Sequence, residues 1–206
     1  MNVSKTCLTI FEKATEDYHQ HNDVDRLIEN PFASTQFEYL LYQKNYIDAV
    51  QWHLEDIVRD PNIAPDKGLM IKRRIDQSNQ DRTDLVEKID DYFLQQFAQV
   101  NYKSDAKINT ESPAWAIDRL SILVLKIYHM KEQVVRDDVD HEHIQKCQHK
   151  LEILNEQKRD LSCSIDELIT DIAAGNRQMK VYRQMKMYND PLLNPVLYSQ
   201  LKNSAS

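Results

Sequence analysis

The chain has 206 residues, a formal net charge of −7 and 29% charged residues. It contains only 2 glycines and 6 prolines, which excludes the turn-dense sequences typical of β-sandwiches, β-barrels and βαβ proteins. The negative charge argues against general binding to nucleic-acid backbones, because such proteins usually present a basic surface. We therefore expect one helical domain, since domains commonly have about 100 to 200 residues.

Between a few proline, glycine and polar clusters, apolar residues recur every three or four positions, as is typical of amphipathic helices. This periodicity predicts five long helices, over residues 4–29, 35–59, 65–100, 113–134 and 144–172. Basic and aromatic residues predict a short helix over 179–188, and Pro191 and Pro195 favour an irregular tail over 191–206. The sequence thus predicts an all-α, up-and-down bundle of about five long helices with a short C-terminal helix, in which residues 1–190 form the domain.

Local signals mark several helix ends. Thr35 and Glu38 have the spacing of a capping box at the start of the second helix. Ser112 and Pro113 suit the N-cap and first position of the fourth helix, and Gly175 suits the end of the fifth. Because the fifth helix has the longest regular apolar repeat, we expect it to form the central packing seam of the bundle.

The three cysteines are Cys7, Cys147 and Cys163, and no pair has Cys-x-x-Cys spacing, so we expect reduced thiols. The first residues lack the basic and apolar regions of a signal peptide. No later stretch approaches the ~20 apolar residues that a membrane span needs. These features predict a cytoplasmic protein.

The second and third expected helices carry polar residues within their apolar stripes. In antiparallel helices the numbers of facing residues have a nearly constant sum, so the short connection between these helices determines which residues meet. This rule predicts three polar pairs: Asp48 with Arg82, Gln51 with Ser78, and Glu55 with Arg74. The pairs would form a polar layer in the middle of the bundle.

The same rule brings Lys126 and His129 of the fourth helix to the level of Arg82. Arg82 and Lys126 would then bind an anionic ligand, and His129 would transfer protons, because the ordinary pKa of histidine lies near neutrality. The alternative is that the layer consists of charge pairs that fix helix register, since polar layers specify packing at a cost in stability. The sequence leaves both interpretations open.

Metal-binding and catalytic motifs are sparse. Ferritin-type di-metal sites need two Glu-x-x-His pairs and two further glutamates, whereas only Glu16 and His19 have this spacing. Glu55 and Asp56, next to His53, resemble faintly the magnesium-binding helices of all-α nucleotide pyrophosphohydrolases, but the denser acidic pattern of those enzymes is missing. We therefore predict no metal site, and the sequence identifies no cofactor.

Five segments carry a family resemblance: Asn30-Pro31-Phe32 through Leu40, Gln51-Trp52-His53-Leu54-Glu55-Asp56, Arg73-Arg74-Ile75-Asp76 through Arg82, Ile117-Asp118-Arg119-Leu120-Ser121-Ile122-Leu123 through His129, and Lys180 through Pro191. They resemble domain-of-unknown-function family 4254, a bacterial helical family, over nearly the whole chain. That resemblance carries no catalytic residue or cofactor. The segment that begins at Ile117 also resembles a helix in proteins associated with glycosyltransferases and envelope sugars, which implies a role in cell-envelope glycan assembly.

The leading hypothesis is a binding or accessory protein in cell-envelope glycan assembly, with a protein partner or an anionic small molecule as its ligand. An alternative is a hydrolase or transferase acting on a phosphorylated or sugar-nucleotide substrate, with Glu55 and Asp56 binding a metal and Arg74, Arg82 and Lys126 binding phosphate. A third is a structural interaction module with a basic tail. The candidate binding residues are Asp48, His53, Glu55, Asp56, Arg74, Asn79, Arg82, Asp118, Arg119, Lys126 and His129.

Overall fold

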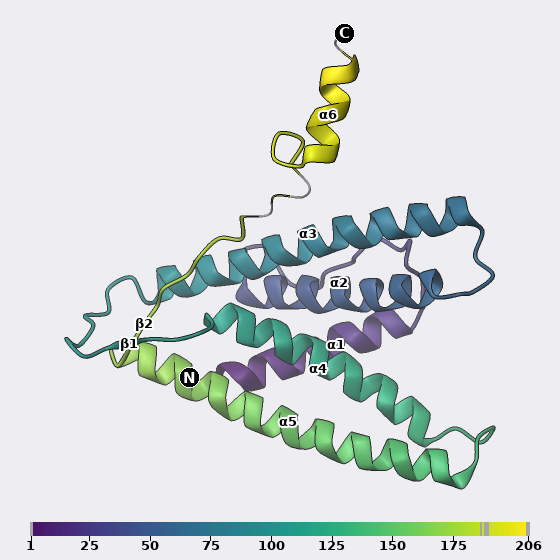
Figure 1. Cartoon of the computed structure of the whole chain (residues 1–206). Helices are drawn as coiled ribbons and strands as arrows, with labels where there is room; N and C mark the ends of the chain where they lie inside the picture. The colour runs from purple at the N-terminus through teal and green to yellow at the C-terminus, as the bar shows by residue number, and fades with distance from the viewer. Residues whose placement is uncertain (1, 186, 188–189, 205–206) are drawn as a thin grey trace.

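Long helices form the body of the protein in the computed structural model, which describes residues 2–185, 187 and 190–204 (Figure 1). They are α1 (Val3–His19), α2 (Phe37–Val58), α3 (Pro65–Gln96), α4 (Pro113–Val134) and α5 (His141–Ala173). A parallel pair of two-residue strands, β1 (Lys107–Ile108) and β2 (Arg177–Gln178), follows α3 and α5, and α6 (Pro195–Ser204) is the last helix. The predicted all-α bundle with a short C-terminal helix is confirmed.

The helix ends follow some of the local signals. The Ser112 side chain accepts a hydrogen bond from the Trp115 amide at the start of α4, as predicted. Gly175 follows the last turn of α5 with a φ of +73°, and a Cβ there would lie 2.5 Å from the Asn101 carbonyl oxygen, so only glycine fits. The predicted capping box is wrong, because α2 begins after Gln36 and that residue makes no side-chain cap.

The C-terminal helix lies later in the chain than predicted. Residues 179–185 have no regular secondary structure, because β2 joins the strand pair and the Met179 amide donates to the Tyr102 hydroxyl. Residues 186 and 188 of the predicted helix lie outside the described residues. The tail over 191–206 is not wholly irregular, since α6 begins at Pro195, a residue suited to the first turn of a helix.

The first helix is shorter than predicted. It ends at His19, and Asn22 takes a φ of +49° while its amide donates to the Tyr18 carbonyl, which stops the helix before residue 29. Residues 20–36 return along the bundle, so α1 and α2 run in the same direction, whereas α2 to α5 alternate in direction as predicted (Figure 1). The contact of α1 with α2 is therefore parallel.

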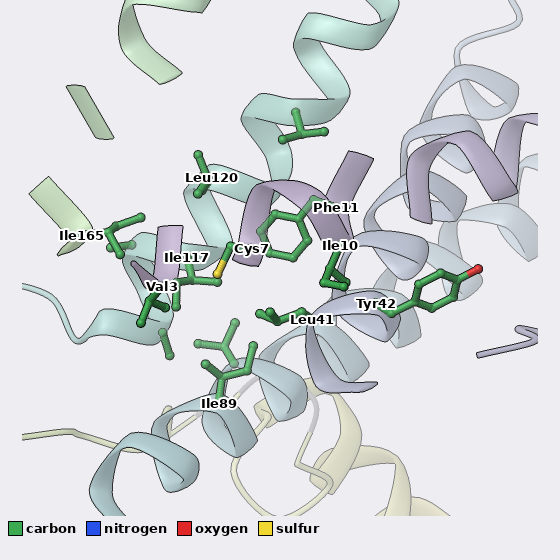
Figure 2. Close-up of a cluster of buried hydrophobic side chains, with 14 of the residues drawn as sticks. Val3, Cys7, Ile10, Phe11, Leu41, Tyr42, Ile89, Ile117, Leu120 and Ile165 are labelled. Atoms are coloured by element: carbon green, nitrogen blue, oxygen red, sulfur yellow. The ribbon is translucent and has the colours of Figure 1, made fainter. Parts of the chain in front are cut away.

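The apolar core surrounds α1 rather than α5. Cys7, Phe11 and Ala14 are fully buried, and Figure 2 shows side chains of α2, α3, α4 and α5 packed around this helix. On α5 only Cys147, Ile165, Ile169 and Ile172 are buried. The expectation that the fifth helix forms the central seam is wrong, because its middle part lies at the edge of the bundle and leaves apolar residues half-exposed.

The end of α3 extends past the start of α4. Asp90 lies about two turns before the last residue of α3. Its carboxyl accepts hydrogen bonds from the Ser112 side chain and the Ala114 amide at the beginning of α4. Burial raises the pKa of the Asp90 carboxyl to about 6, against an ordinary value of 3.8, and these two hydrogen bonds oppose only part of the rise. Ionised Asp90 therefore opposes folding.

Asp90→Asn is expected to stabilise the protein above about pH 6 and to have little effect near pH 4. The folded carboxyl holds its proton more tightly than the unfolded one, so the wild-type chain loses stability as the pH rises between those values. Urea unfolding at several pH values measures the difference. Asp84→Asn, an exposed change on the same helix, is the control. An equal effect of Asp90→Asn at both pH extremes would contradict the prediction.

Candidate functional site

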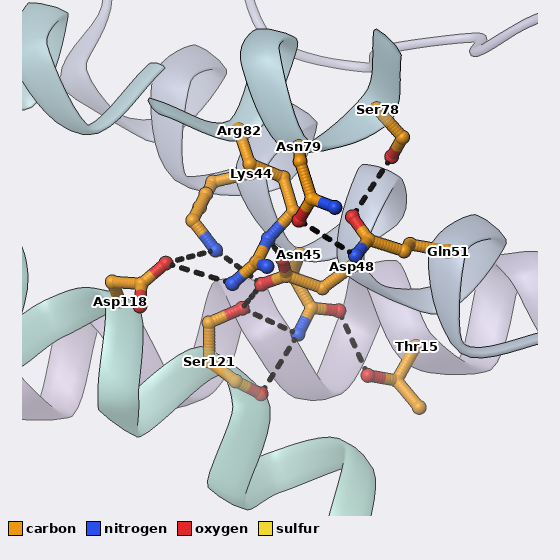
Figure 3. Close-up of polar contacts among 10 residues, drawn as sticks. All are labelled: Thr15, Lys44, Asn45, Asp48, Gln51, Ser78, Asn79, Arg82, Asp118 and Ser121. Atoms are coloured by element: carbon orange, nitrogen blue, oxygen red, sulfur yellow. Dashed lines mark hydrogen bonds and ion pairs between the residues drawn. The ribbon is translucent and has the colours of Figure 1, made fainter. Parts of the chain in front are cut away.

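Four charged side chains form a buried network among α2, α3 and α4 (Figure 3). The Lys44 ammonium, which is 0% exposed, contacts Asp48 and lies 2.7 Å from Asp118 Oδ1. Arg82 Nε lies 2.5 Å from Asp48 Oδ1, and its Nη2 lies 3.2 Å from Asp118 Oδ1. We call these residues the charge quartet. Each cation contacts both carboxylates, and the two positive charges balance the two negative charges.

Uncharged polar groups extend the charge quartet towards α1. The Ser121 hydroxyl donates to Asp48 Oδ2 at 2.6 Å, and Asn45 Nδ2 donates to the Ser121 hydroxyl at 3.1 Å. Thr15 on α1 donates to the Asn45 side-chain oxygen at 2.8 Å. Because each buried group finds a partner, the network joins α1, α2, α3 and α4 without leaving these atoms unsatisfied.

The two carboxylates of the charge quartet neutralise its two cations. Burial alone lowers the pKa of the Arg82 guanidinium, but the Asp48 and Asp118 carboxylates outweigh that effect and raise the pKa. Arg82 is therefore a permanent cation whose charge is already neutralised by two carboxylates. This arrangement favours the register interpretation of the polar layer over direct binding of an anion by Arg82.

The predicted register between α2 and α3 is partly right. Asp48 meets Arg82, and the Ser78 hydroxyl donates to the Gln51 side-chain oxygen at 3.0 Å. Gln51 also donates to the Asn79 side-chain oxygen at 2.9 Å.

The third predicted pair is wrong. Glu55 pairs at 2.7 Å with Arg59, the residue that directly follows α2, and Arg74 pairs with Asp25 at 2.8 Å. Residues 20–36 supply Asp25 at this end of the bundle, so Arg74 has a partner that the sequence rule did not consider.

The predicted register between α3 and α4 is wrong by about two turns. Asp118, not Lys126, meets Arg82, because α3 overlaps the beginning of α4 instead of ending level with it. Arg119 points elsewhere and pairs with Glu111, with 65% of its side chain exposed. Lys126 and His129 line a different cavity from Arg82.

A cleft of about 330 Å³ lies against the charge quartet. It is bounded by α2, α3 and α4 and lined by Asp48, Gln51, Trp52, Glu55, Asp56, Arg59, Arg82, Ile122 and Leu125. Its two arginines are engaged by carboxylates, Arg82 in the charge quartet and Arg59 by Glu55. This cleft therefore offers little uncompensated positive charge.

A larger cleft, of about 510 Å³, lies between α2, α4 and α5. Its lining is Trp52, Asp56, Lys126, His129, Met130, Gln133, Lys150, Ile153 and Leu154, and we call it the lysine cleft. Among the described residues, neither Lys126 nor Lys150 has an ion pair or hydrogen bond. Trp52 and Asp56 line both clefts, so the two cavities are neighbours.

Three histidines from three helices meet beside the lysine cleft. One ring nitrogen from each of His19, His53 and His129 lies within 4.8 Å of the others, and we call the three residues the histidine cluster. His53 Nε2 lies 3.3 Å from His19 Nε2. Burial lowers the pKa of His19 and of His53, and in both the neighbouring His129 adds to this effect. The environment therefore favours the neutral form of His19 and His53.

Glu55 and Asp56 do not build the metal site of the enzyme hypothesis. Glu55 pairs with Arg59, Asp56 is exposed, and within the described part of the chain neither joins two further residues with ligand-bearing side chains. Among the described residues, the histidine cluster is the set of three side chains that lie close enough together to bind one metal ion.

Sequence reasoning missed several residues of this region. Lys44 carried a signal, because a lysine within an apolar stripe, four residues before Asp48, has to find buried partners. His19 was noticed only for its spacing from Glu16. Trp52 and Lys150 carried no signal, since their place in the lysine cleft depends on how α5 packs against α4.

Lys44→Met is expected to lower the free energy of unfolding by about 3 to 5 kcal/mol, because it leaves two buried carboxylates to share one cation. Lys72→Met is the matched control, since the Lys72–Asp76 pair is half-exposed and should contribute about 0 to 1 kcal/mol. Adding Asp118→Asn to Lys44→Met should recover part of the loss by restoring the charge balance. Equal effects of the two lysine changes in urea unfolding would contradict this role of the charge quartet.

The comparisons with known proteins identify a family. No curated protein and no solved structure matches the chain. None of the described helices is both long enough and apolar enough to cross a membrane. The family described as "Protein of unknown function (DUF4254)" matches residues 38–181, which include all but the first residue of α2 and the whole of α3, α4 and α5. Because this match covers most of the chain, the protein belongs to the DUF4254 family.

Proposed function

We propose that this protein binds an anionic small molecule in the lysine cleft. The observation that carries the proposal is the pair of exposed lysines, Lys126 from α4 and Lys150 from α5, which line one cavity and have no partner among the described residues. Asp56 is the acidic residue in this lining. A positive cleft in a chain with a net charge of −7 would attract anions.

The walls of the lysine cleft suit a ligand with a ring or an apolar body. Met130, Ile153 and Leu154 supply apolar surface, and Ile153 is 41% exposed. The Trp52 ring stacks on His129 with 4.7 Å between ring centroids and an angle of 15°, which holds the indole in one orientation. Apolar walls with a few polar groups are typical of small-molecule sites.

These features favour a phosphorylated ligand with a ring, such as a sugar phosphate or a sugar nucleotide. The lysines would contact the phosphate, and Trp52 with the apolar wall would contact the ring. This ligand class agrees with the predicted accessory role in cell-envelope glycan assembly. A cytoplasmic location is part of the proposal, and the free thiols of Cys7, Cys147 and Cys163 support it.

The interaction-module alternative has less support. It relied on a basic C-terminal segment, but Arg183 of that segment pairs with Glu87 at 3.1 Å and also contacts Asp91, both on α3. This cation of the tail is thus used by the bundle itself, which leaves less charge for an acidic partner.

A thermal-shift screen with sugar nucleotides, sugar phosphates and inorganic pyrophosphate tests the proposed function. A ligand present at about 100 times its dissociation constant should add about 2.7 kcal/mol of stability. Lys126→Ala and Lys150→Ala should each weaken the binding of the best compound by about tenfold to 100-fold, because a hydrogen bond to a charged group contributes about 1.5 to 3 kcal/mol.

The control is Lys88→Ala, which removes the same charge from an exposed position on α3. It should leave the affinity unchanged, whereas a purely long-range charge effect would weaken binding in all three variants. If no compound stabilises the wild-type chain, or if the cleft variants bind like the wild type, the proposal is wrong.

A further inference from the structure

The geometry points to a transition-metal site of the zinc type, formed by His19, His53 and His129. These residues come from α1, α2 and α4, and each offers one ring nitrogen that lies within 4.8 Å of the other two. The inference does not depend on the proposed function, because Lys126 and Lys150 are not members of the histidine cluster. It also differs from the sequence-based prediction, which included no metal site.

The spacing of the ring nitrogens fits tetrahedral coordination. Zinc–imidazole bonds of about 2.0 to 2.1 Å in tetrahedral geometry place two ligand nitrogens about 3.3 Å apart. The distance between His19 Nε2 and His53 Nε2 is 3.3 Å, which is long for a hydrogen bond between two nitrogens but matches that separation. A nitrogen of His129 lies within 4.8 Å of the other two, so a small inward movement of this ring completes the set.

The outer nitrogens of two rings are already engaged as in known metal sites. His19 Nδ1 lies 2.7 Å from the Thr15 carbonyl oxygen and must donate a proton to it, because a carbonyl oxygen only accepts. His129 Nδ1 lies 2.8 Å from Glu132 Oε2 and donates in the same way. In the neutral rings these bonds leave a lone pair on Nε2. Metal-binding histidines commonly make this outer bond to a carbonyl or carboxylate.

The second nitrogen of His129, which does not contact Glu132, gives an independent indication. This Nε2 atom is buried and has no hydrogen-bond partner among the described residues. A buried polar atom without a partner costs free energy, and such atoms are uncommon in folded proteins. A metal ion bound to this nitrogen would remove that cost.

Aromatic rings hold the three imidazoles in place. Tyr128 packs on His19 with 4.1 Å between ring centroids, and Tyr18 stacks on His53 at 5.1 Å. Trp52 stacks on His129 at 4.7 Å. Each ligand ring is thus oriented by a neighbour before any metal binds, which reduces the entropy lost on coordination.

The ligand set selects the class of metal. Three neutral imidazoles suit Zn²⁺, Co²⁺, Ni²⁺ or Cu²⁺, whereas Mg²⁺ and Ca²⁺ prefer oxygen ligands. The lowered pKa values of His19 and His53 keep these rings unprotonated near neutral pH, as coordination requires. Three protein ligands leave one tetrahedral position open, which is typical of catalytic zinc sites and not of closed structural ones.

The test is titration of the chelator-treated, full-length protein with Co²⁺ and Zn²⁺. Isothermal titration should give one ion per chain, and Co²⁺ should develop the intense visible absorption of tetrahedral coordination. His53→Ala and His129→Ala should abolish that absorption. Loss of a hydrogen-bond partner of a metal ligand weakens metal affinity by about 10-fold to 100-fold, and loss of the ligand itself should weaken it further. Glu132→Gln should show a loss within that range.

His21→Ala and His141→Ala are the controls, since both histidines are exposed and His21 is only two residues from His19. They should bind Co²⁺ like the wild type. If His53→Ala does not fold by circular dichroism, His129→Gln gives the same comparison from another helix. The inference is overturned if the wild type shows no tetrahedral Co²⁺ spectrum, or if the control variants lose as much affinity as the cluster variants.

The two proposals can fail separately. Lys126→Ala should keep the Co²⁺ spectrum while it weakens binding of the anionic compound. A chain that binds the metal but none of the anions would refute only the lysine cleft, and a chain that binds anions without a Co²⁺ spectrum would refute only the metal site.

Discussion

A lysine buried completely in a helical bundle determines how three of its helices can pack. Transferring the Lys44 ammonium from water costs several kcal/mol, which only close opposite charges offset. Asp48 lies one turn away on α2, but the second carboxylate, Asp118, comes from α4, and Arg82 of α3 neutralises the excess negative charge. Sliding either neighbouring helix by one turn, about 5.4 Å, would leave a buried charge unpaired. The charge quartet thus fixes the register of α2, α3 and α4.

The charge quartet neutralises Arg82 but not Lys126, so only the lysine has a positive charge available to a ligand. Arg82 lines the smaller cleft, but its two carboxylate partners neutralise it there. Lys126 lies about two turns after Asp118 on α4 and has no ion pair with either carboxylate. It lines the lysine cleft together with Lys150. The half-exposed middle of α5 makes this possible, because Ile153 and Leu154 form a wall of the cleft and do not enter the core.

The sequence predicted the parts of this arrangement that depend on short-range geometry. The connection between α2 and α3 is short, so Asp48 and Gln51 were placed opposite Arg82 and Ser78 correctly. The connection before α4 is long and contains β1, so it does not determine where α4 begins relative to α3. Asp90 near the end of α3 contacts Ser112 at the start of α4, and no periodicity reveals this overlap. The all-α fold class was predictable from composition, whereas the position of α4 along α3 depended on tertiary contacts.

The histidine cluster depends on the direction of α1. Thr15 meets Asn45 and His19 meets His53, so residue numbers rise together along the two parallel helices. Had α1 been antiparallel to α2 with the Thr15–Asn45 contact kept, Leu41 would lie level with His19, about three turns from His53. The early end of α1 and the return of residues 20–36 along the bundle are therefore what bring His19 to His53 and His129. A segment without regular structure thus determines which chemistry the helices can support.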